Sequence, residues 1–307
     1  ISVQNEYGKM TNKGWEFRVD AVPFENRDWR VGFYFNIAHN ENKITEMPDN
    51  YTEENYTFNN GEYAYRREEG RPMGSFYGYR YKGVCQNKDA TYARDADGNV
   101  MKDISGNAIV MRNGTATIAP GDALYEDINH DGVINQYDIV YLGNSNPRFT
   151  GGAGVNVSYK QFKLSAIFYG RYGQDVVNST RLNNESMRGI DNQSTAVLRR
   201  WRNEGDQTDI PRALYGEGYN TLGSDRFVED ASYLRLKSLS FNYRLPKKII
   251  QRWGFSNIDV YVTGYNLFTW TKYTGQDPEV KTENTYARDS ATTPASIQLV
   301  AGFNLSF

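Results

Sequence analysis

The sequence predicts an all-β protein, the C-terminal part (about seven antiparallel strands) of a large transmembrane β-barrel. Short segments alternate apolar and polar residues with the period of two that a half-exposed strand requires. The connections between these segments are alternately short and long, as they are at the two rims of an outer-membrane barrel. No apolar run approaches the roughly 18 residues that a membrane-crossing helix needs.

The composition fits this fold class. Hydrophobic residues make up 39% of the 307 residues, and the mean hydropathy is −0.71, which suits strands with one polar face. The 24 tyrosines favour strands and membrane–water interfaces. A net charge of −2 argues against nucleic acid as the main partner. Cys85 is alone, which excludes an intrachain disulfide, and a chain that begins at Ile1 is expected to be a mature form or a fragment.

Two hairpins are expected in the first 171 residues. The first pairs residues 15–22 with 29–38 across a short turn, and the second pairs 151–159 with 162–171 across Lys160 and Gln161. In each strand one face is apolar. In the second strand, for example, this face carries Trp29, Val31, Phe33, Phe35 and Ile37.

Three more strands follow, at 233–245, 258–270 and 296–307. The first of them alternates cleanly in its second half, but its first half places Arg235 and Lys237 on the apolar side. We place the apolar residues of the next strand outward, because the other choice exposes Asp259 to lipid. They are Ile258, Val260 and Val262.

The long connections cover about 39–148, 174–231 and 271–294, and the second contains one short helix at 195–202. Because periplasmic turns are short and extracellular loops are long, we expect all three to be extracellular and the last strand to descend to the periplasm. Arg235 and Lys237 would then lie near the lipid headgroups, where a charge on the lipid face costs only about 0–1 kcal/mol.

Seven strands are too few to close such a barrel, since bacterial barrels have even numbers from about 8 upward. Unpaired backbone groups at an open edge would find no water in lipid. We therefore expect residues 296–307 to pair with a first barrel strand that these residues do not include. The side chains expected to face lipid are those of Ile297, Leu299, Ala301, Phe303, Leu305 and Phe307.

One motif in the first long connection predicts a metal site. Oxygen-bearing side chains stand at positions 1, 3, 5, 9 and 12 of a loop with glycine at position 6, which is the spacing of a calcium-binding EF-hand loop. The predicted ligands are Asp127, Asn129, Asp131, the backbone carbonyl of Val133, Asn135 and Asp138. We expect a structural calcium ion without the flanking helices. The alternative is an Asx-rich turn that binds no metal.

No set of residues predicts an enzyme. Asp277 and Glu279 are close in sequence, but a glycosidase needs two carboxylates placed across a cleft. His39 and His130 have no nucleophile at a suitable spacing, and we expect both to be satisfied or solvated. The aromatic run Phe76, Tyr77, Tyr79 and Tyr81 could stack on sugar rings or peptide side chains, although packing inside the long loop is favoured.

Several stretches resemble the SusC/RagA-like TonB-dependent outer-membrane transporters of Bacteroidetes, and the resemblance covers essentially the whole chain. The matching stretches are GKMTNKGWE at 8–16, YLRLKSL at 233–239, YNLFTWTKY at 265–273 with Asp277-Pro278-Glu279, and the terminal Phe307. The second and third are specific in combination. Phe307 resembles the signal that the barrel-assembly machinery recognises.

The resemblance implies a barrel of about 22 strands with an N-terminal plug, in the bacterial outer membrane. It also implies a SusD-like surface lipoprotein as a lid, energy input through the TonB complex, and import of oligosaccharides or oligopeptides. Residues 1–307 would form the C-terminal segment of the barrel, and the plug domain and TonB box would lie upstream. The alternative is a soluble β-rich surface or carbohydrate-binding protein with a calcium loop, which would not need detergent.

Overall fold

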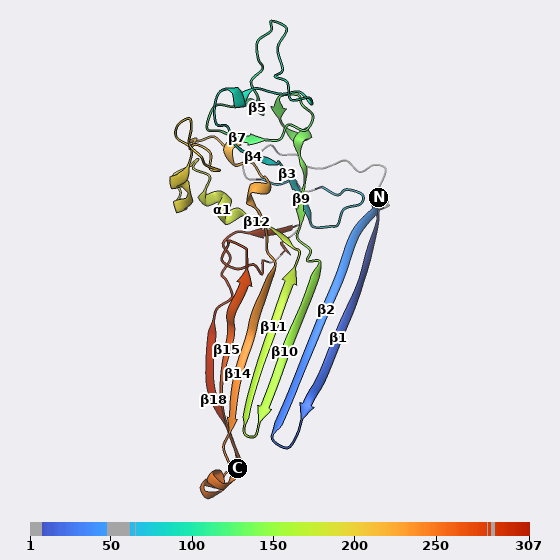
Figure 1. The fold of residues 1–307 in the computed structure, drawn as a ribbon, viewed down its shortest axis with the longest axis vertical. Helices are drawn as coiled ribbons and strands as arrows, with labels where there is room; N and C mark the ends of the chain where they lie inside the picture. Colours follow the sequence, from blue (N-terminus) through green and yellow to red (C-terminus); the bar gives the residue numbers. More distant parts are fainter. Residues whose placement is uncertain (1–7, 48–61, 65, 281, 284–285) are drawn as a thin grey trace, which may run out of the picture.

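A computed structural model describes residues 8–47, 62–64, 66–280, 282–283 and 286–307. Its main element is an antiparallel sheet of seven strands in the order β1-β2-β10-β11-β14-β15-β18 (Figure 1). The strands are β1 Lys9–Glu25, β2 Trp29–Glu46, β10 Phe149–Tyr159, β11 Phe162–Tyr172, β14 Tyr233–Arg244, β15 Asn257–Thr271 and β18 Gln298–Ser306. The predicted seven-stranded antiparallel sheet is therefore confirmed.

The first hairpin is longer than the alternation predicts. β1 begins at Lys9 instead of residue 15, and β2 continues to Glu46 instead of residue 38, so the first long connection begins at 47. Residues in these extensions still pair, for example Asn12 with Asn42, although they no longer alternate in polarity. Hydrophobic periodicity marks only the part of a strand that has an apolar side, whereas backbone pairing extends beyond it.

The outer strands of the sheet each have one neighbour. Within the described residues, β1 pairs with β2 alone and β18 pairs with β15 alone. The last strand therefore has a neighbour on one side only in the described part of the chain, and both edges of this sheet present backbone groups that no described strand pairs.

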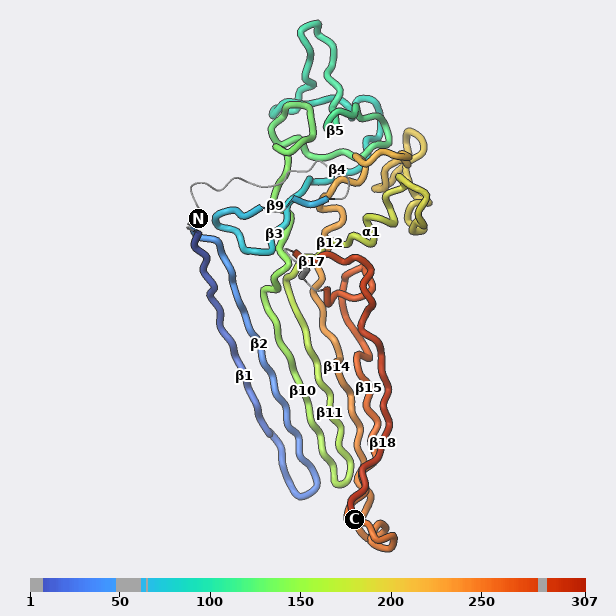
Figure 2. Tube along the Cα trace, turned by 180° about the vertical axis from the view of Figure 1, so that it is seen from behind, coloured from blue at the N-terminus to red at the C-terminus, as the bar shows by residue number. Residues whose placement is uncertain are grey.

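The three long connections gather at one end of the sheet, and the short turns lie at the other (Figures 1 and 2). We call residues 62–148, 173–232 and 272–297, as far as they are described, the loop layer. The turn between β14 and β15 holds α2 Lys247–Ile250 and the 3-10 turn Gln251–Trp253.

The first connection of the loop layer contributes short strands and two 3-10 turns. The strands are β3 Ser75–Gly78, β4 Tyr81–Val84, β5 Arg112–Asn113, β6 Ala116–Thr117, β7 Ala123–Tyr125, β8 Val133–Ile134 and β9 Val140–Asn144, and the turns are Asp89–Thr91 and Gln136–Asp138. They form small sheets, β3 with β9, β4 with β7, and β6-β5-β8.

The second and third connections interleave. The second contains β12 Asp175–Asn178, α1 Ser179–Asn184, β13 Val228–Asp230 and 3-10 turns at Thr195–Arg199, Tyr219–Thr221 and Asp225–Phe227. The third contains β16 Thr282–Glu283 and β17 Tyr286–Asp289, and β12 pairs with both β13 and β17. The helix predicted at 195–202 is a shorter 3-10 turn, because the backbone is extended at Arg200.

The hydrophobic cores lie in the loop layer. Four clusters of buried side chains are centred on Tyr77, Phe76, Val176 and Ile210. No helix in the described part of the chain is long and apolar enough to span a membrane.

Candidate functional site

The seven-stranded sheet has one apolar face. Residues that pair directly across antiparallel strands point to the same side, so each register row shows what one face carries. One central row consists of Ala21, Phe33, Val155, Ala166, Leu239, Gly264 and Leu299. Val260, Val262, Ala301 and Phe303 lie on this face too, as the sequence predicts, and this face is called the apolar face below.

Aromatic residues concentrate in two rows of the apolar face. Near the short turns the rings of Trp29 and Tyr159 lie 4.3 Å apart, and those of Phe162 and Tyr243 lie 4.6 Å apart. Near the loop layer the second row contains Trp15, His39, Phe149 and Tyr172.

The separation of these two rows matches a bilayer. On β2 the rows are marked by Trp29 and His39. The ten steps from Trp29 to His39 span ~33 Å along a strand, or ~25 Å of height at a tilt of ~40°, which is the height of the apolar band between the aromatic girdles of an outer-membrane barrel. The aromatic rows therefore mark the two borders of a surface of membrane thickness.

The opposite face is polar. The row nearest the short turns consists of Arg30, Ser158, Lys163, Asn242, Tyr261 and Gly302. Charged residues on this face pair with one another, as Arg244 does with Asp259 at 2.9 Å. An apolar side and a polar side over the same strands are what a barrel wall between lipid and a water-filled lumen requires.

The placement of Arg235 and Lys237 on the lipid side is wrong. Phe168 of β11 pairs with Leu236, and its neighbour Ile167 pairs with Ser238, so Lys237 is an extra residue in a β-bulge. A bulge reverses the alternation at one point of a strand. Leu234 and Leu236 consequently take the apolar positions, and Arg235 points to the polar face.

On the polar face Arg235 joins β14 to the third long connection. Its side chain is 3% exposed, and its guanidinium lies 2.5 Å from Asp277 and 2.8 Å from Glu279. Glu279 also accepts from the Lys237 ammonium at 3.0 Å. The stretches YLRLKSL and DPE, which carry the sequence resemblance, are thus in direct contact. The guanidinium of Arg235 thus forms ion pairs with both carboxylates, those of Asp277 and Glu279.

The environment of Asp277 favours its charged form. Burial alone would raise the pKa of this carboxyl. The backbone N–H groups of Ala295 and Glu279 and the guanidinium of Arg235 outweigh burial, and together they lower the pKa below its usual value.

The aromatic run in the first connection packs inside the loop layer. Phe76 and Tyr77 are fully buried, and Tyr79 is 3% exposed. The Tyr77 hydroxyl donates to Glu68 at 2.9 Å, and the Tyr81 hydroxyl donates to the carbonyl of Asp209 at 2.7 Å. The favoured interpretation, packing within the loop, is confirmed, and the buried rings are not available for stacking on a ligand.

The predicted calcium loop has a compact backbone. His130 and Gly132 adopt positive φ values of 57° and 82°, and the Asp127 carboxylate accepts from the backbone N–H of Gly132 at 2.8 Å. Both oxygens of Asp138 accept backbone N–H groups, one from Ile128 and one from Asn135, each at 2.8 Å.

Two features of this loop do not match a formed metal site. The side-chain amide of Asn135 donates to the carbonyl of Val133 at 3.1 Å, and this carbonyl is one of the predicted ligands. The described residues contain no group of three or more His, Cys, Asp or Glu side chains placed to hold a metal ion. The loop therefore holds its predicted ligands along one turn without gathering the carboxylates. Calcium binding stays a prediction.

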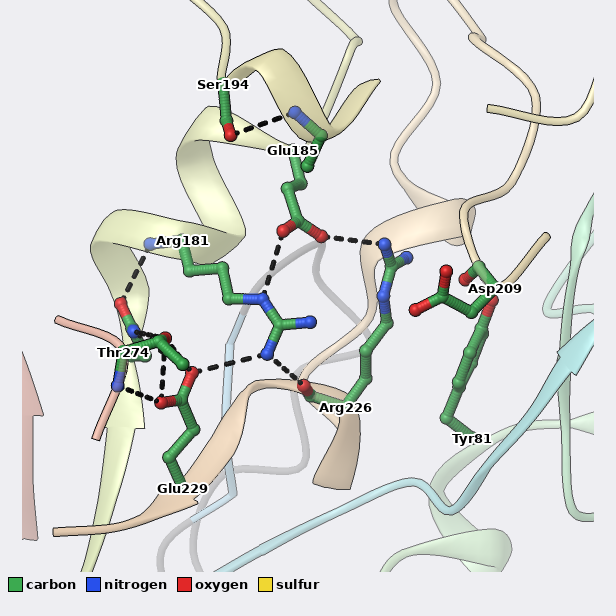
Figure 3. Close-up of polar contacts among 10 residues, drawn as sticks. Tyr81, Arg181, Glu185, Ser194, Asp209, Arg226, Glu229 and Thr274 are labelled. Carbon is green, nitrogen blue, oxygen red and sulfur yellow. Dashed lines mark hydrogen bonds and ion pairs between the residues drawn. The ribbon is translucent and has the colours of Figure 1, made fainter. Parts of the chain in front are cut away.

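A buried ionic network that the sequence does not reveal ties the loop layer together (Figure 3). Glu185 accepts from Arg181 at 3.0 Å and from Arg226 at 2.8 Å, and Arg181 also reaches Glu229 at 3.2 Å. Glu229 in turn accepts from Thr274 of the third connection at 2.8 Å. Arg181 and Glu185 stand four residues apart at α1, a spacing that the sequence shows, but Arg226, Glu229 and Thr274 come from distant segments, and only the fold brings them to this pair.

A polar pocket of about 450 Å³ lies where the sheet meets the loop layer. Its lining includes His39, Lys43, Tyr141, Arg148 and Asp175. Nδ1 of His39 lies 2.7 Å from the carbonyl oxygen of Arg148, so the ring of this histidine has a hydrogen-bond partner in the backbone. Burial raises the pKa of Asp175 above its usual range.

Comparison with curated proteins identifies relatives of one kind. The chain is 33% identical over 292 residues to the TonB-dependent receptor P3 of Formosa agariphila, an alignment covering 92% of this chain and 26% of that receptor. It is 25% identical over 310 residues to the TonB-dependent receptor SusC of Bacteroides thetaiotaomicron, covering 98% of this chain and 27% of SusC. The chain thus spans about a quarter of the length of these relatives. No family model matches it.

Solved structures give the same result. The RagAB peptide transporter superposes with a TM-score of 0.69 at 27% identity, covering 99% of this chain and 30% of the other. The RagAB peptide importer in its open-open state gives a TM-score of 0.66 at 25% identity. The homologues of this chain are TonB-dependent receptors that include SusC, and its structural neighbours are RagAB, so the resemblance seen in the sequence is confirmed.

Proposed function

We propose that residues 1–307 form the C-terminal part of the wall of a TonB-dependent outer-membrane importer. The observation that carries this proposal is the division of seven adjoining strands into an apolar face and a polar face, with aromatic rows at both borders of the apolar one. In the proposed arrangement the apolar face contacts lipid, the polar face lines the lumen, and other strands of the intact protein pair with the free edges of β1 and β18.

The loop layer is proposed to be extracellular and the short turns periplasmic. Long loops on one rim and short turns on the other support this orientation. With the strand ends as they are, the extracellular segments become 47–148, 173–232 and 272–297.

The proposed partners are a SusD-like surface lipoprotein and the TonB complex, and the proposed cargo is an oligosaccharide or an oligopeptide. SusC and RagAB among the relatives support this pairing. The loop layer offers exposed apolar side chains to a partner: Ile190, Leu198 and Tyr215 are 93%, 66% and 79% exposed. The polar pocket around Tyr141 and Asp175, at the junction of the sheet and the loop layer, offers polar groups for binding a cargo.

Membrane placement is tested with the intact protein. We expect it to sediment with outer membranes, to need detergent for extraction, and to migrate faster in unheated than in heated electrophoresis samples. The soluble carbohydrate-binding alternative predicts neither detergent dependence nor heat-modifiable migration. Transport is tested by uptake of labelled oligosaccharides and peptides, which should stop when the proton-motive force is collapsed.

Calcium binding by the Asp127–Asp138 loop is a second proposal, as a structural ion that stiffens the first connection. It rests on the ligand spacing and on the positive φ values at His130 and Gly132, which bend the loop as an EF-hand loop bends. Isothermal calorimetry on chelator-treated intact protein should show calcium uptake that Asp131→Ala abolishes. Asp95→Ala, in another Asx turn of the same connection, is the matched control.

A further inference from the structure

The apolar face has a gap in its cover of large side chains near the loop layer. One register row near the loop layer consists of Ile37, Gly151, Gly170, Leu234 and Trp270. The two glycines are neighbours at the centre of this row, on β10 and β11. Adjacent strands lie ~4.8 Å apart, so these glycines leave a strip two strands wide without side chains between Ile37 and Leu234.

This gap is the floor of a groove of about 680 Å³. Phe149 and Tyr172 bound it on the loop-layer side, Phe35 and Ala153 line its other end, and Trp270 forms a lateral wall. The lining is predominantly apolar, and the groove lies at the level of the aromatic row nearest the loop layer. For comparison, a cavity of ~150 Å³ already admits a benzene molecule.

A lysine stands at the rim of the groove nearest the loop layer. Lys272 stands two residues after Trp270, directly after the end of β15, and its side chain is exposed. It takes part in none of the ion pairs found among the described residues. Asp230 also borders the groove, but its carboxylate accepts from the backbone N–H of Ser232 at 2.8 Å and from the Ser232 hydroxyl. Arg171 borders the groove as well, but it belongs to a polar-face position and donates to the Tyr169 hydroxyl at 3.1 Å. The rim thus combines one exposed lysine with one hydrogen-bonded arginine and one hydrogen-bonded carboxylate.

We propose that this groove holds an acyl chain of an anionic membrane lipid, with the lipid phosphate at Lys272. The proposal rests on the proposed membrane placement, which turns the groove toward lipid. Lipid tails are as apolar as leucine, so selective retention has to come from close packing and from charge. The groove supplies close packing, because an acyl chain can approach the backbone at Gly151 and Gly170. Lys272 supplies the charge.

The charge of the rim favours a lipid over a protein side chain as the occupant. An aliphatic or aromatic side chain of a second copy could fill the recess, but it would leave Lys272 without an anion. A phosphate lies directly above the acyl region of a bilayer, and Lys272 likewise lies on the loop-layer side of the glycine row, two residues beyond Trp270.

The test uses the intact protein, reconstituted with phosphatidylglycerol or with phosphatidylcholine and examined by native mass spectrometry for retained lipid. We expect selective retention of phosphatidylglycerol. Ala153→Phe, which fills the groove from a position that already has an outward Cβ, should abolish the selectivity. Ala166→Phe, the same change on the apolar face outside the groove, should leave it intact. Lys272→Gln should weaken retention about fivefold, and Lys13→Gln, on the same face of β1, should not.

The groove is not a lipid site if Ala153→Phe and Ala166→Phe retain phosphatidylglycerol equally, or if Ala153→Phe changes the oligomeric state instead. Ala153→Leu, a smaller filling, keeps the test valid if Ala153→Phe fails to fold. Heat-modifiable migration is measured on every variant. A protein that is membrane-bound and heat-modifiable but shows no lipid selectivity overturns this inference alone. One that needs no detergent overturns the proposed membrane placement.

Discussion

The sheet and the loop layer achieve stability in opposite ways. The loop layer buries its side chains in four clusters and carries networks such as Arg181–Glu185–Arg226, as a small water-soluble domain does. The sheet exposes large apolar side chains instead, for example 67% of Phe303 and 46% of Phe241. Its backbone ladders are internal, but its apolar face needs a partner that is not part of this chain.

The two regions therefore differ in which substitutions destabilise them. In the loop layer a buried charge depends on one or two specific partners, so removing a partner leaves that charge desolvated. In the sheet, lipid is expected to replace a protein core, and any apolar side chain on that face serves almost equally well. Charge introduced there has no partner and no water.

The largest effect is expected from Glu185→Ala. Arg226 is 4% exposed at its side chain and Glu185 accepts its one described hydrogen bond, so the substitution leaves a buried guanidinium uncompensated. Breaking such a pair costs ~3–5 kcal/mol. Limited proteolysis of the intact protein should cut the loop layer much faster, while heat-modifiable migration is unchanged.

The control for this variant is Glu25→Ala, in an ion pair with Arg30 whose side chains are 55% and 60% exposed. Such a pair is worth at most ~1 kcal/mol. Equal protease resistance in both variants would contradict the view that the loop layer depends on its buried network.

The second largest effect is expected from Val155→Arg, at the centre of the apolar face. An arginine at the bilayer midplane costs ~2–4 kcal/mol. Asn156→Arg, one residue further on the polar face, should cost little. Denaturant unfolding in lipid vesicles measures both, and similar costs for the two variants would show that the two faces do not differ in environment.

The sequence predicts the sheet far better than the loop layer, for a physical reason. Alternation in residues such as 29–38 records a lipid side and a water side along a single strand, so a local pattern carries the information. The contact between Arg226 and Glu185 depends instead on segments 41 residues apart, and no local pattern records it.

Local departures also limit what alternation can predict. Lys237 is the extra residue of a bulge, and nothing in YLRLKSL distinguishes a bulged lysine from one that faces lipid. The polarity of Arg235 was the available signal, because a bulge is the cheaper way to keep an arginine out of lipid. Asp277 and Glu279, the partners of Arg235, lie in the third long connection, more than 40 residues further along the chain.

A smaller effect, confined to the loop layer, is expected from Gly121→Ala. Gly121 has a φ of +90°, and a Cβ there would lie 2.3 Å from the ring of Trp201. Gly98 has a similar φ of +86° with nothing within 4 Å of its Cβ position, so Gly98→Ala reports the backbone strain alone. The difference between the two variants should be ~1–3 kcal/mol, the cost of overpacking. Equal protease resistance of the two variants would mean that the packing around Gly121 rearranges to accommodate the added methyl group without a measurable cost.

The smallest effect is expected from acid at the junction between the two regions. The folded pKa of Asp277 is lowered from 3.8, so its contribution to stability is complete above that value and is lost as the pH falls through the folded pKa. The third connection should therefore stay bound to β14 at pH 5 and loosen only below about pH 4. The protection factors of residues 272–280 in hydrogen exchange measure this loosening. We expect Asp277→Asn to loosen the connection already at pH 7. If the protection factors of residues 272–280 at pH 7 are the same in Asp277→Asn and in the wild-type protein, the attraction between Arg235 and Asp277 does not hold the loop layer to the sheet.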